Sequence, residues 1–194
     1  MYDIPCVILA GGKSSRMGED KSLLPFENCD TLIEYQYKKI SKLFKKVYIS
    51  SKENKFNFQT NLILDNISDT SSPLVALQSI FNNIKDEKVF IITVDTPLVL
   101  ESTIEKLINK SADYAVTIAQ SEDRIHNLCG VFSRKTIPLI DKLLQKDIHK
   151  INYLIKQTNN YHKLNFTNSD QFINLNTKED YNKAVLISKS YIEY

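Results

Sequence analysis

The sequence predicts an α/β fold in which a single domain, residues 1–194, contains an open, mostly parallel sheet with helices on both faces. Two observations lead to this prediction. Short, continuously apolar runs, typical of strands buried on both faces, recur along the chain, and the strongest covers residues 89–94. Stretches whose apolar residues recur at helical spacing lie between these runs. Strands that alternate with helices in this way form parallel sheets through crossover connections.

The first half of the chain alternates regularly and carries clear boundary signals. Asp30 or Thr31 is the candidate N-cap of the first helix. Pro73 opens the second helix, because proline is tolerated in the first turn, and Pro97 stops the strand before it from extending. The expected elements are a strand at 4–10, a helix at 32–44, strands at 47–49 and 62–64, a helix at 73–84 and a strand at 89–94.

The second half of the chain is less regular, but apolar runs and helical spacing still alternate in it. We expect a helix at 102–109, strands at 114–119 and 128–132, helices at 136–144 and 152–156, strands at 161–166 and 172–175, and a closing helix at 178–190. No repeat or linker divides the sequence, which favours the single domain.

Composition narrows the functions that the chain can have. It has 194 residues, 42% of them hydrophobic, so it can bury a full core. With 25 basic and 23 acidic residues the net charge is +2, and no basic run indicates nucleic-acid binding. No apolar stretch reaches the length of a membrane span, and the N-terminus lacks a secretory signal pattern. The three cysteines form no C-x-x-C pair, which favours the reducing cytoplasm. Together with the charge and the lack of a membrane span, this predicts a cytoplasmic protein with neither membrane nor nucleic-acid partners.

The loop after the first strand is the richest in candidate binding residues. Gly11 and Gly12 let the backbone approach a ligand and turn its amides outward, which suits phosphate groups. Arg16 and Lys21 add two cations. The Gly-Lys-Ser that begins at Gly12 matches the end of a P-loop, but Val7 stands where that motif needs its first glycine, and no G-x-G-x-x-G is present. A flexible turn with solvated charges is the alternative interpretation.

Further polar residues follow predicted strands, at the edge of the sheet where open α/β folds bind ligands. Asp95 either binds Mg²⁺, which often takes only one or two carboxylates beside substrate phosphates, or caps the next helix. Asp65 ends the third predicted strand, where a turn is the simpler interpretation. Asn174 and Asn176 flank Leu175 at strand spacing, so their side chains would point to one face as core-edge hydrogen bonders or as ligands.

The histidines and Cys129 offer weaker signals. The three histidines show no spacing of metal ligands and are interpreted as surface or hydrogen-bonded polar residues; they are His126, His149 and His162. No histidine partner is indicated for Cys129, so packing is the simpler interpretation of that side chain.

The loop 9–21 resembles the L-A-G-G-x-S-x-R-M-G-x-D-K signature of the molybdenum cofactor guanylyltransferases, the MobA family. Three more segments follow in family order. Asp65 precedes Pro73-Leu74 as the family's aspartate precedes G-P-L-A-G. Asp95-Thr96-Pro97 resembles the family's D-x-P element, and residues 174–177 resemble its N-x-N-T segment. The resemblance spans residues 4 to about 185 and implies a Rossmann-like nucleotidyltransferase fold.

The resemblance also implies a reaction. Enzymes of this family use GTP with Mg²⁺ as cofactor to transfer GMP to the terminal phosphate of Mo-molybdopterin, which releases pyrophosphate and yields molybdopterin guanine dinucleotide. The partners would be GTP, Mo-molybdopterin and, transiently, proteins of molybdenum insertion and molybdoenzyme maturation. Electrostatics and positioning would determine the rate, because the nucleophile is already ionised and two anions must meet.

Roles for single residues are implied in the same way. Arg16, Lys21 and Asp95 would be catalytic, with Asp95 binding the metal. The nucleotide would lie against residues near the ends of the first strands, namely Leu9, Ala10, Gly11, Gly12, Gly18, Lys21, Ser50, Asp65 and Asp95. The pterin substrate would lie on the side of Asn174, Asn176 and Lys150.

Three segments depart from the family pattern, and we interpret them as tuning because none touches the first loop or Asp95. Ser72-Pro73-Leu74-Val75-Ala76 lacks both glycines of G-P-L-A-G. Ser50-Ser51 stands where some members have asparagine, and His149-Lys150 stands where the family is often arginine-rich.

Two alternatives to guanylyl transfer remain. A cytidylyltransferase acting on the same cofactor would share the fold, although such enzymes tend to carry L-A-A-G where this chain has L-A-G-G. A non-catalytic carrier of the cofactor is disfavoured, because all three expected catalytic residues are present.

Overall fold

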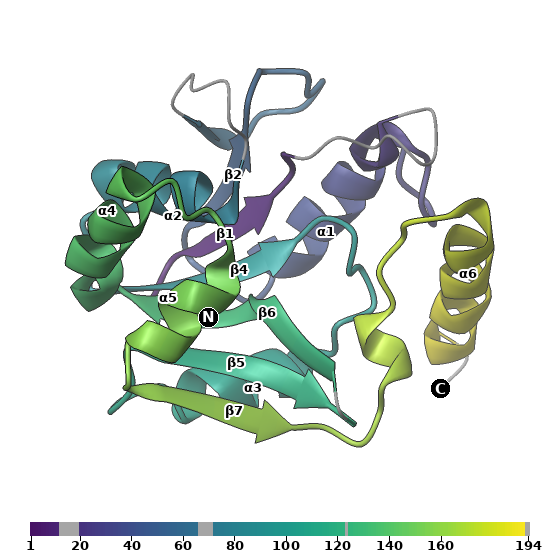
Figure 1. The fold of residues 1–194 in the computed structure, drawn as a ribbon. Coiled ribbons are helices and arrows are strands. Elements are labelled where there is room, and N and C mark those ends of the chain that lie inside the picture. Colours follow the sequence, from purple (N-terminus) through teal and green to yellow (C-terminus); the bar gives the residue numbers. More distant parts are fainter. Residues whose placement is uncertain (12–19, 66–71, 123, 193–194) are drawn as a thin grey trace.

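The computed structural model describes residues 1–11, 20–65, 72–122 and 124–192, and within these ranges seven strands form one sheet (Figure 1). The strands are β1 (Cys6–Leu9), β2 (Val47–Ser51), β3 (Asn61–Leu64), β4 (Lys88–Thr93), β5 (Val116–Ser121), β6 (Arg124–Ser133) and β7 (Tyr161–Asn165). Their order is β3-β2-β1-β4-β6-β5-β7. Only β6 runs against the others, pairing antiparallel with β4 and β5. The predicted α/β class with an open, mostly parallel sheet is confirmed.

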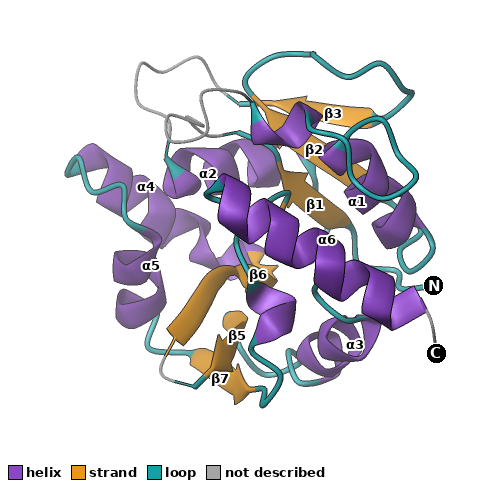
Figure 2. Ribbon diagram, turned by 90° about the vertical axis from the view of Figure 1, so that its right-hand side faces the viewer, coloured by secondary structure: helices purple, strands orange, loops and turns teal. Residues whose placement is uncertain are grey.

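The helices cover both faces of the sheet, as predicted (Figure 2). One face packs against α1 (Leu32–Ser41), α3 (Glu101–Asn109) and α6 (Lys178–Ile192). The other packs against α2 (Pro73–Asn83), α4 (Ile137–Gln145) and α5 (Ile151–Gln157). Within the described ranges, no helix is long and apolar enough to cross a membrane.

Side-chain alternation along β1 explains why its sequence is continuously apolar. Cys6 and Ile8 enter the core on the α1 face, whereas Val7 and Leu9 enter the core on the α2 face. Three of these four side chains are fully buried, and Leu9 is nearly so. A strand with helices on both sides leaves no position for a polar side chain.

Two of the predicted helix starts are supported by their capping contacts. The Thr31 hydroxyl accepts the backbone N–H of Glu34 at 3.2 Å, which selects Thr31 over Asp30 as the cap of α1. At α2 the Ser72 hydroxyl accepts the N–H of Val75 at 3.2 Å, and Pro73 occupies the first turn. Both helices therefore begin where the sequence places them.

The segment 172–175 is not a strand, which corrects the sequence prediction. It consists of the end of a 3₁₀ turn, η3 (Asp170–Phe172), followed by irregular chain. The backbone N–H of Leu175 donates to the carbonyl of Asp95 at 2.9 Å, so this segment crosses the end of β4 instead of joining the edge of the sheet. Asn174 and Asn176 therefore do not share the face of a strand, and the Asn176 N–H donates to the Asn174 carbonyl at 2.8 Å.

Strand β6 begins at Arg124, four residues before the predicted start at 128. The additional residues pair with β5, with Arg124 opposite Ser121 and Ile125 opposite Gln120. Pairing between neighbouring strands extends β6 into a sequence that shows no apolar run. As a result, residues 124–126 are paired with β5 rather than lying in a loop, and the register shifts between them and Gly130.

Candidate active site

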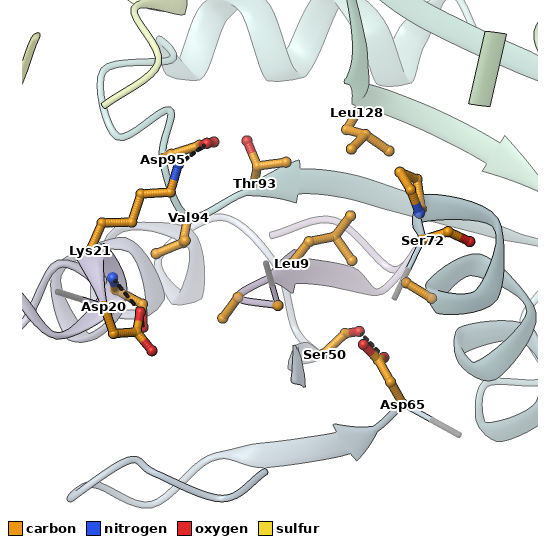
Figure 3. A pocket seen from close by; sticks show the side chains of 15 residues that line it. Leu9, Asp20, Lys21, Ser50, Asp65, Ser72, Thr93, Val94, Asp95 and Leu128 are labelled. Atoms are coloured by element: carbon orange, nitrogen blue, oxygen red, sulfur yellow. Dashed lines mark hydrogen bonds and ion pairs between the residues drawn. The ribbon is translucent and has the colours of Figure 1, made fainter. Parts of the chain in front are cut away.

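The carboxyl ends of β1 to β4 meet at one edge of the sheet, where a cavity of about 300 Å³ opens (Figure 3). Its walls come from the ends of these strands, from η1 (Lys21–Leu23) and from the N-terminus of α2. The charged residues among the described lining are Asp20, Lys21, Asp65 and Asp95. This excess of carboxylates suits the binding of a cation together with an anionic ligand.

Lys21 joins three distant parts of the chain at the rim of this cavity. Its ammonium donates to Asp95 Oδ2 at 2.7 Å (Figure 3). It also donates to Asn176 Oδ1 at 3.2 Å. The side chains of Lys21 and Asp95 are each 19% exposed, so water reaches the ion pair and a ligand can replace it. The beginning, middle and end of the sequence thus supply one ammonium, one carboxylate and one amide to the same point.

The position of Lys21 is set by the residue before it. Asp20 caps η1, and its Oδ1 accepts the Ser22 N–H at 3.0 Å and the Ser22 hydroxyl at 2.7 Å. Its other carboxylate oxygen is paired with Lys55, from the loop between β2 and β3. Although partial burial opposes the charged form, these hydrogen bonds lower the pKa of Asp20. Lys55 thereby links the β2–β3 loop to the segment that presents Lys21.

The turn after β4, which carries Asp95, is held from α1. The ammonium of Lys39 donates to the carbonyls of Pro97 and Val99, each at 2.7 Å. Burial lowers the pKa of Lys39 to about 8, while the charge of Glu101 opposes this shift. A half-buried cation with two carbonyl partners fixes the backbone that follows Asp95.

Asp65 and Ser50 form the opposite wall of the cavity, beside the end of β1 (Figure 3). The Ser50 hydroxyl donates to Asp65 Oδ1 at 2.7 Å. A Cβ on Gly11 would lie 3.4 Å from Asp65 Oδ2, so the glycine leaves this carboxylate open to the cavity. The backbone N–H of Ala10 donates to the Ser50 carbonyl at 2.9 Å, which joins this wall to β1. Ser50 therefore contacts the start of the first loop, which corrects the expectation that the departing segments do not touch it.

A second cavity, of about 320 Å³, adjoins the first and shares Thr93, Asp95 and Leu128 with it. It extends along β6 on the other side of Asp95. Its polar lining comes from Thr93, Asp95, Thr96, Arg124, His126, Asn127 and Asn174. Asp95 therefore stands between two spaces, each large enough for part of a substrate.

His126 is built into the wall of the second cavity as a neutral ring. It stacks on Phe172, with 4.1 Å between ring centroids and 14° between planes, and its Nε2 lies 2.8 Å from the Ser121 hydroxyl. Burial lowers the pKa of His126 to about 4, and Arg124 adds to the effect. This agrees with the interpretation of His126 as a hydrogen-bonded polar residue.

The structure brings most of the sequence-predicted site residues together. Seven of them line the first cavity, namely Leu9, Ala10, Gly11, Lys21, Ser50, Asp65 and Asp95. Asn176 contacts Lys21, and Asn174 lines the second cavity. Lys150 is exposed and is not among the residues that line either cavity, although Ile151 beside it lines the second. Gly12, Arg16 and Gly18 lie outside the described residues.

Sequence reasoning missed Arg124 and Asn127, which face the second cavity. It also missed the contact of Lys55 with Asp20. None of the three belongs to a motif. Arg124 pairs with Ser121 of β5 and Asn127 lies at the register shift of β6, so only the tertiary structure places both on the cavity that Asp95 also lines. A sequence prediction that began β6 earlier would have found Arg124 and Asn127, but not Lys55.

Comparison with known proteins decides the family. Residues 6–161 match the MobA-like NTP transferase domain. The molybdenum cofactor guanylyltransferase of Campylobacter jejuni subsp. doylei is 40% identical over 94% of this chain and 96% of its own length. The chain belongs to the MobA-like NTP transferase family. It is therefore a nucleotidyltransferase by family, and the predicted resemblance to the guanylyltransferases is confirmed.

Other MobA-like proteins agree in sequence and fold. The molybdenum cofactor guanylyltransferase of Helicobacter pylori strain 26695 is 36% identical, over 96% of this chain and 94% of its own. Molybdopterin-guanine dinucleotide biosynthesis protein A from Archaeoglobus fulgidus has the same fold, with a TM-score of 0.80 at 17% identity, over 96% of this chain and 100% of that one.

Proposed function

We propose that this MobA-like protein transfers GMP from GTP to the terminal phosphate of Mo-molybdopterin, as a molybdenum cofactor guanylyltransferase. The contact of Lys21 with Asp95 and Asn176, at the boundary between two cavities, carries the proposal. A group transfer needs two substrates to meet at one charged point, and Asp95 lines both cavities. The names of the relatives supply the identity of the nucleotide and of the acceptor.

In this proposal the nucleotide occupies the first cavity and the acceptor the second. Backbone groups of Ala10 and Gly11, with the Ser50–Asp65 pair, face the base and ribose. The α-phosphate then lies near Lys21 and Asp95. The second cavity offers the guanidinium of Arg124 to an acceptor phosphate.

The chemistry requires little proton transfer. An oxygen of the acceptor phosphate attacks the α-phosphorus of GTP and forms a new P–O bond. The bond from the α-phosphorus to the bridging oxygen breaks, and pyrophosphate departs with the electron pair. Lys21 lowers the repulsion between the two anions, and the cavities fix the attacking and leaving groups in line. The attacking phosphate is already ionised, so His126, neutral and stacked, needs no acid or base role.

The residues present suit a divalent cation bound together with a nucleotide. The described residues hold no group of three or more His, Cys, Asp or Glu side chains that would bind a metal by themselves. Mg²⁺ commonly uses one or two carboxylates and completes its shell with phosphate oxygens and water. Asp95 would hold the cation. The amide oxygen of Asn176 lies near Asp95, because both side chains accept from the ammonium of Lys21. A bound Mg²⁺ would stabilise the charge that develops on the phosphates.

The decisive assay incubates the purified protein with Mo-molybdopterin and GTP, CTP or ATP, with and without Mg²⁺, and measures pyrophosphate and the dinucleotide. We expect pyrophosphate and the dinucleotide to form with MgGTP only. Asp95→Asn should lower turnover at least 100-fold, the cost typical of losing a key electrostatic group, while the circular dichroism spectrum stays unchanged. Turnover with CTP would establish the cytidylyl alternative. Tight cofactor binding without turnover of any nucleotide would establish a carrier.

Cellular context completes the proposal. The product must reach apo-enzymes, so we propose transient contacts with proteins of molybdenum insertion and molybdoenzyme maturation, in the cytoplasm. Cross-linking in cells followed by mass spectrometry would test these contacts, and recovery of this protein without any such partner would contradict them.

A further inference from the structure

Two of the segments that depart from the family pattern, around Ser72 and His149, contact each other in the structure. The Ser72 hydroxyl lies 3.1 Å from Nδ1 of His149. Nε2 of the same imidazole lies 2.9 Å from Asp147 Oδ1. Ser72 opens α2 and lines the first cavity, whereas His149 lies between α4 and α5, 77 residues later. The contact therefore links the N-terminus of α2, which lines the first cavity, to the connection between α4 and α5.

Local structure places His149 for this contact. Helix α4 ends with the Asp147 N–H donating to the Leu144 carbonyl and the Ile148 N–H donating to the Leu143 carbonyl, each at 2.9 Å. Asp147 has a φ of 56°, a left-handed conformation that aspartate tolerates better than most residues. This helix-ending motif turns the chain sharply, and α5 begins two residues after His149.

One arrangement of hydrogens satisfies every group in this chain of contacts. The Val75 N–H donates to the Ser72 oxygen, and the Ser72 hydroxyl donates to Nδ1 of His149. In this arrangement the Nε2–H of the imidazole donates to Asp147. The His149 side chain is 25% exposed, but Asp147 is 97% exposed, so water competes strongly only at the outer contact. The contact between Ser72 and His149 is the one that joins the two elements.

We infer that Ser72 and His149 form a clasp that positions the start of α5 for binding of the acceptor. The inference rests on the proposed function. Ile151, two residues after His149, lines the second cavity, and the exposed Lys150 stands between them. The clasp thus fixes the wall of the second cavity relative to α2, which lines the first. His149 is a positioning residue in this account and does not touch the reacting atoms. A glycine at position 72 has no hydroxyl to make the contact.

Steady-state kinetics of His149→Ala, Ser72→Gly and the double variant test the clasp, with GTP and Mo-molybdopterin varied separately. Glycine is itself tolerated at a helix N-cap, so Ser72→Gly should fold. We expect each single variant to raise KM for Mo-molybdopterin about fivefold, the contribution of one hydrogen bond, and KM for GTP less than twofold. The double variant should be no worse than either single one. Multiplied effects in the double variant, or a rise confined to KM for GTP, would overturn the inference.

Two matched variants of the same loop serve as controls. Asp147→Asn alters only the outer, solvated contact, and Lys146→Ala changes an exposed side chain at the end of α4. Both should leave KM for Mo-molybdopterin within twofold of the wild type. A fivefold rise in the Lys146→Ala variant would show that any change in this loop has the effect, which would contradict a specific clasp.

Nitrogen-15 NMR of the histidine side chains tests the clasp independently of activity. The wild type should show His149 with Nδ1 unprotonated and Nε2 protonated, and Ser72→Gly should shift both signals. Unchanged signals would refute the clasp even if the enzyme turns over. Shifted signals in a protein that transfers no nucleotide would leave the clasp standing and refute the proposed function.

Discussion

Lys39 provides the sharpest test of how the turn behind Asp95 is held. Its pKa is lowered from 10.5 to about 8 by burial, which corresponds to about 3 kcal/mol of unfavourable free energy for the ammonium in the native state. In the unfolded chain the pKa returns to about 10.4. Between pH 8 and 10.5 the unfolded state therefore binds more protons, so the free energy of unfolding rises with pH in this window.

Urea unfolding of the wild type and of Lys39→Met at pH 7, 8, 9 and 10 measures this contribution. Methionine keeps the apolar stem and does not titrate, so the other groups largely cancel in the difference between the two proteins. We expect that difference to be constant below pH 8 and to rise in favour of the wild type, by about 3 kcal/mol in all when extended to pH 10.5. A constant difference over the whole range would refute the reasoning, because it would mean that the carbonyls of Pro97 and Val99 fully compensate the burial of the ammonium.

Three further predictions concern the parts that frame the site. Gly130→Ala should lower the free energy of unfolding by about 3 kcal/mol, because its Cβ would overlap the carbonyl of Thr117; an unchanged urea midpoint would contradict this close approach of β6 and β5. Lys55→Met should raise KM for GTP about fivefold, because it removes the ion pair that holds Asp20, and Lys55→Arg should restore the wild-type KM. The same KM for GTP in Lys55→Met and the wild type would contradict a positioning role for Lys55. His126 has its pKa lowered to about 4, so between pH 6.5 and 4 the unfolded chain binds the proton more readily than the native state. The free energy of unfolding of the wild type should therefore fall by at most about 3 kcal/mol over this range because of His126. A His126→Phe variant with the same pH dependence of unfolding as the wild type would disprove this.

Local signals in the sequence were sufficient for most of the elements. The continuously apolar runs at β1 and β4 are strands buried on both faces, and the helices expected after Thr31 and at Pro73 begin there. The prediction failed at 172–175, where an apolar run packs across the end of β4 without a strand partner. An apolar run shows that a segment is buried, but not whether a neighbouring strand is available to pair with it.

The sequence by itself determined the α/β class, the family resemblance and the residues at the ends of β1 and β4, because these depend on short-range patterns. Only the tertiary structure decided that Lys21 contacts both Asp95 and Asn176, that Arg124 faces a second cavity, and that His149 contacts Ser72. The hydrogen-bonded pairs among these residues lie 74 to 155 positions apart, and strand order and register set the distances between their side chains. No local pattern encodes such distances, since they arise only when the sheet and its helices pack together.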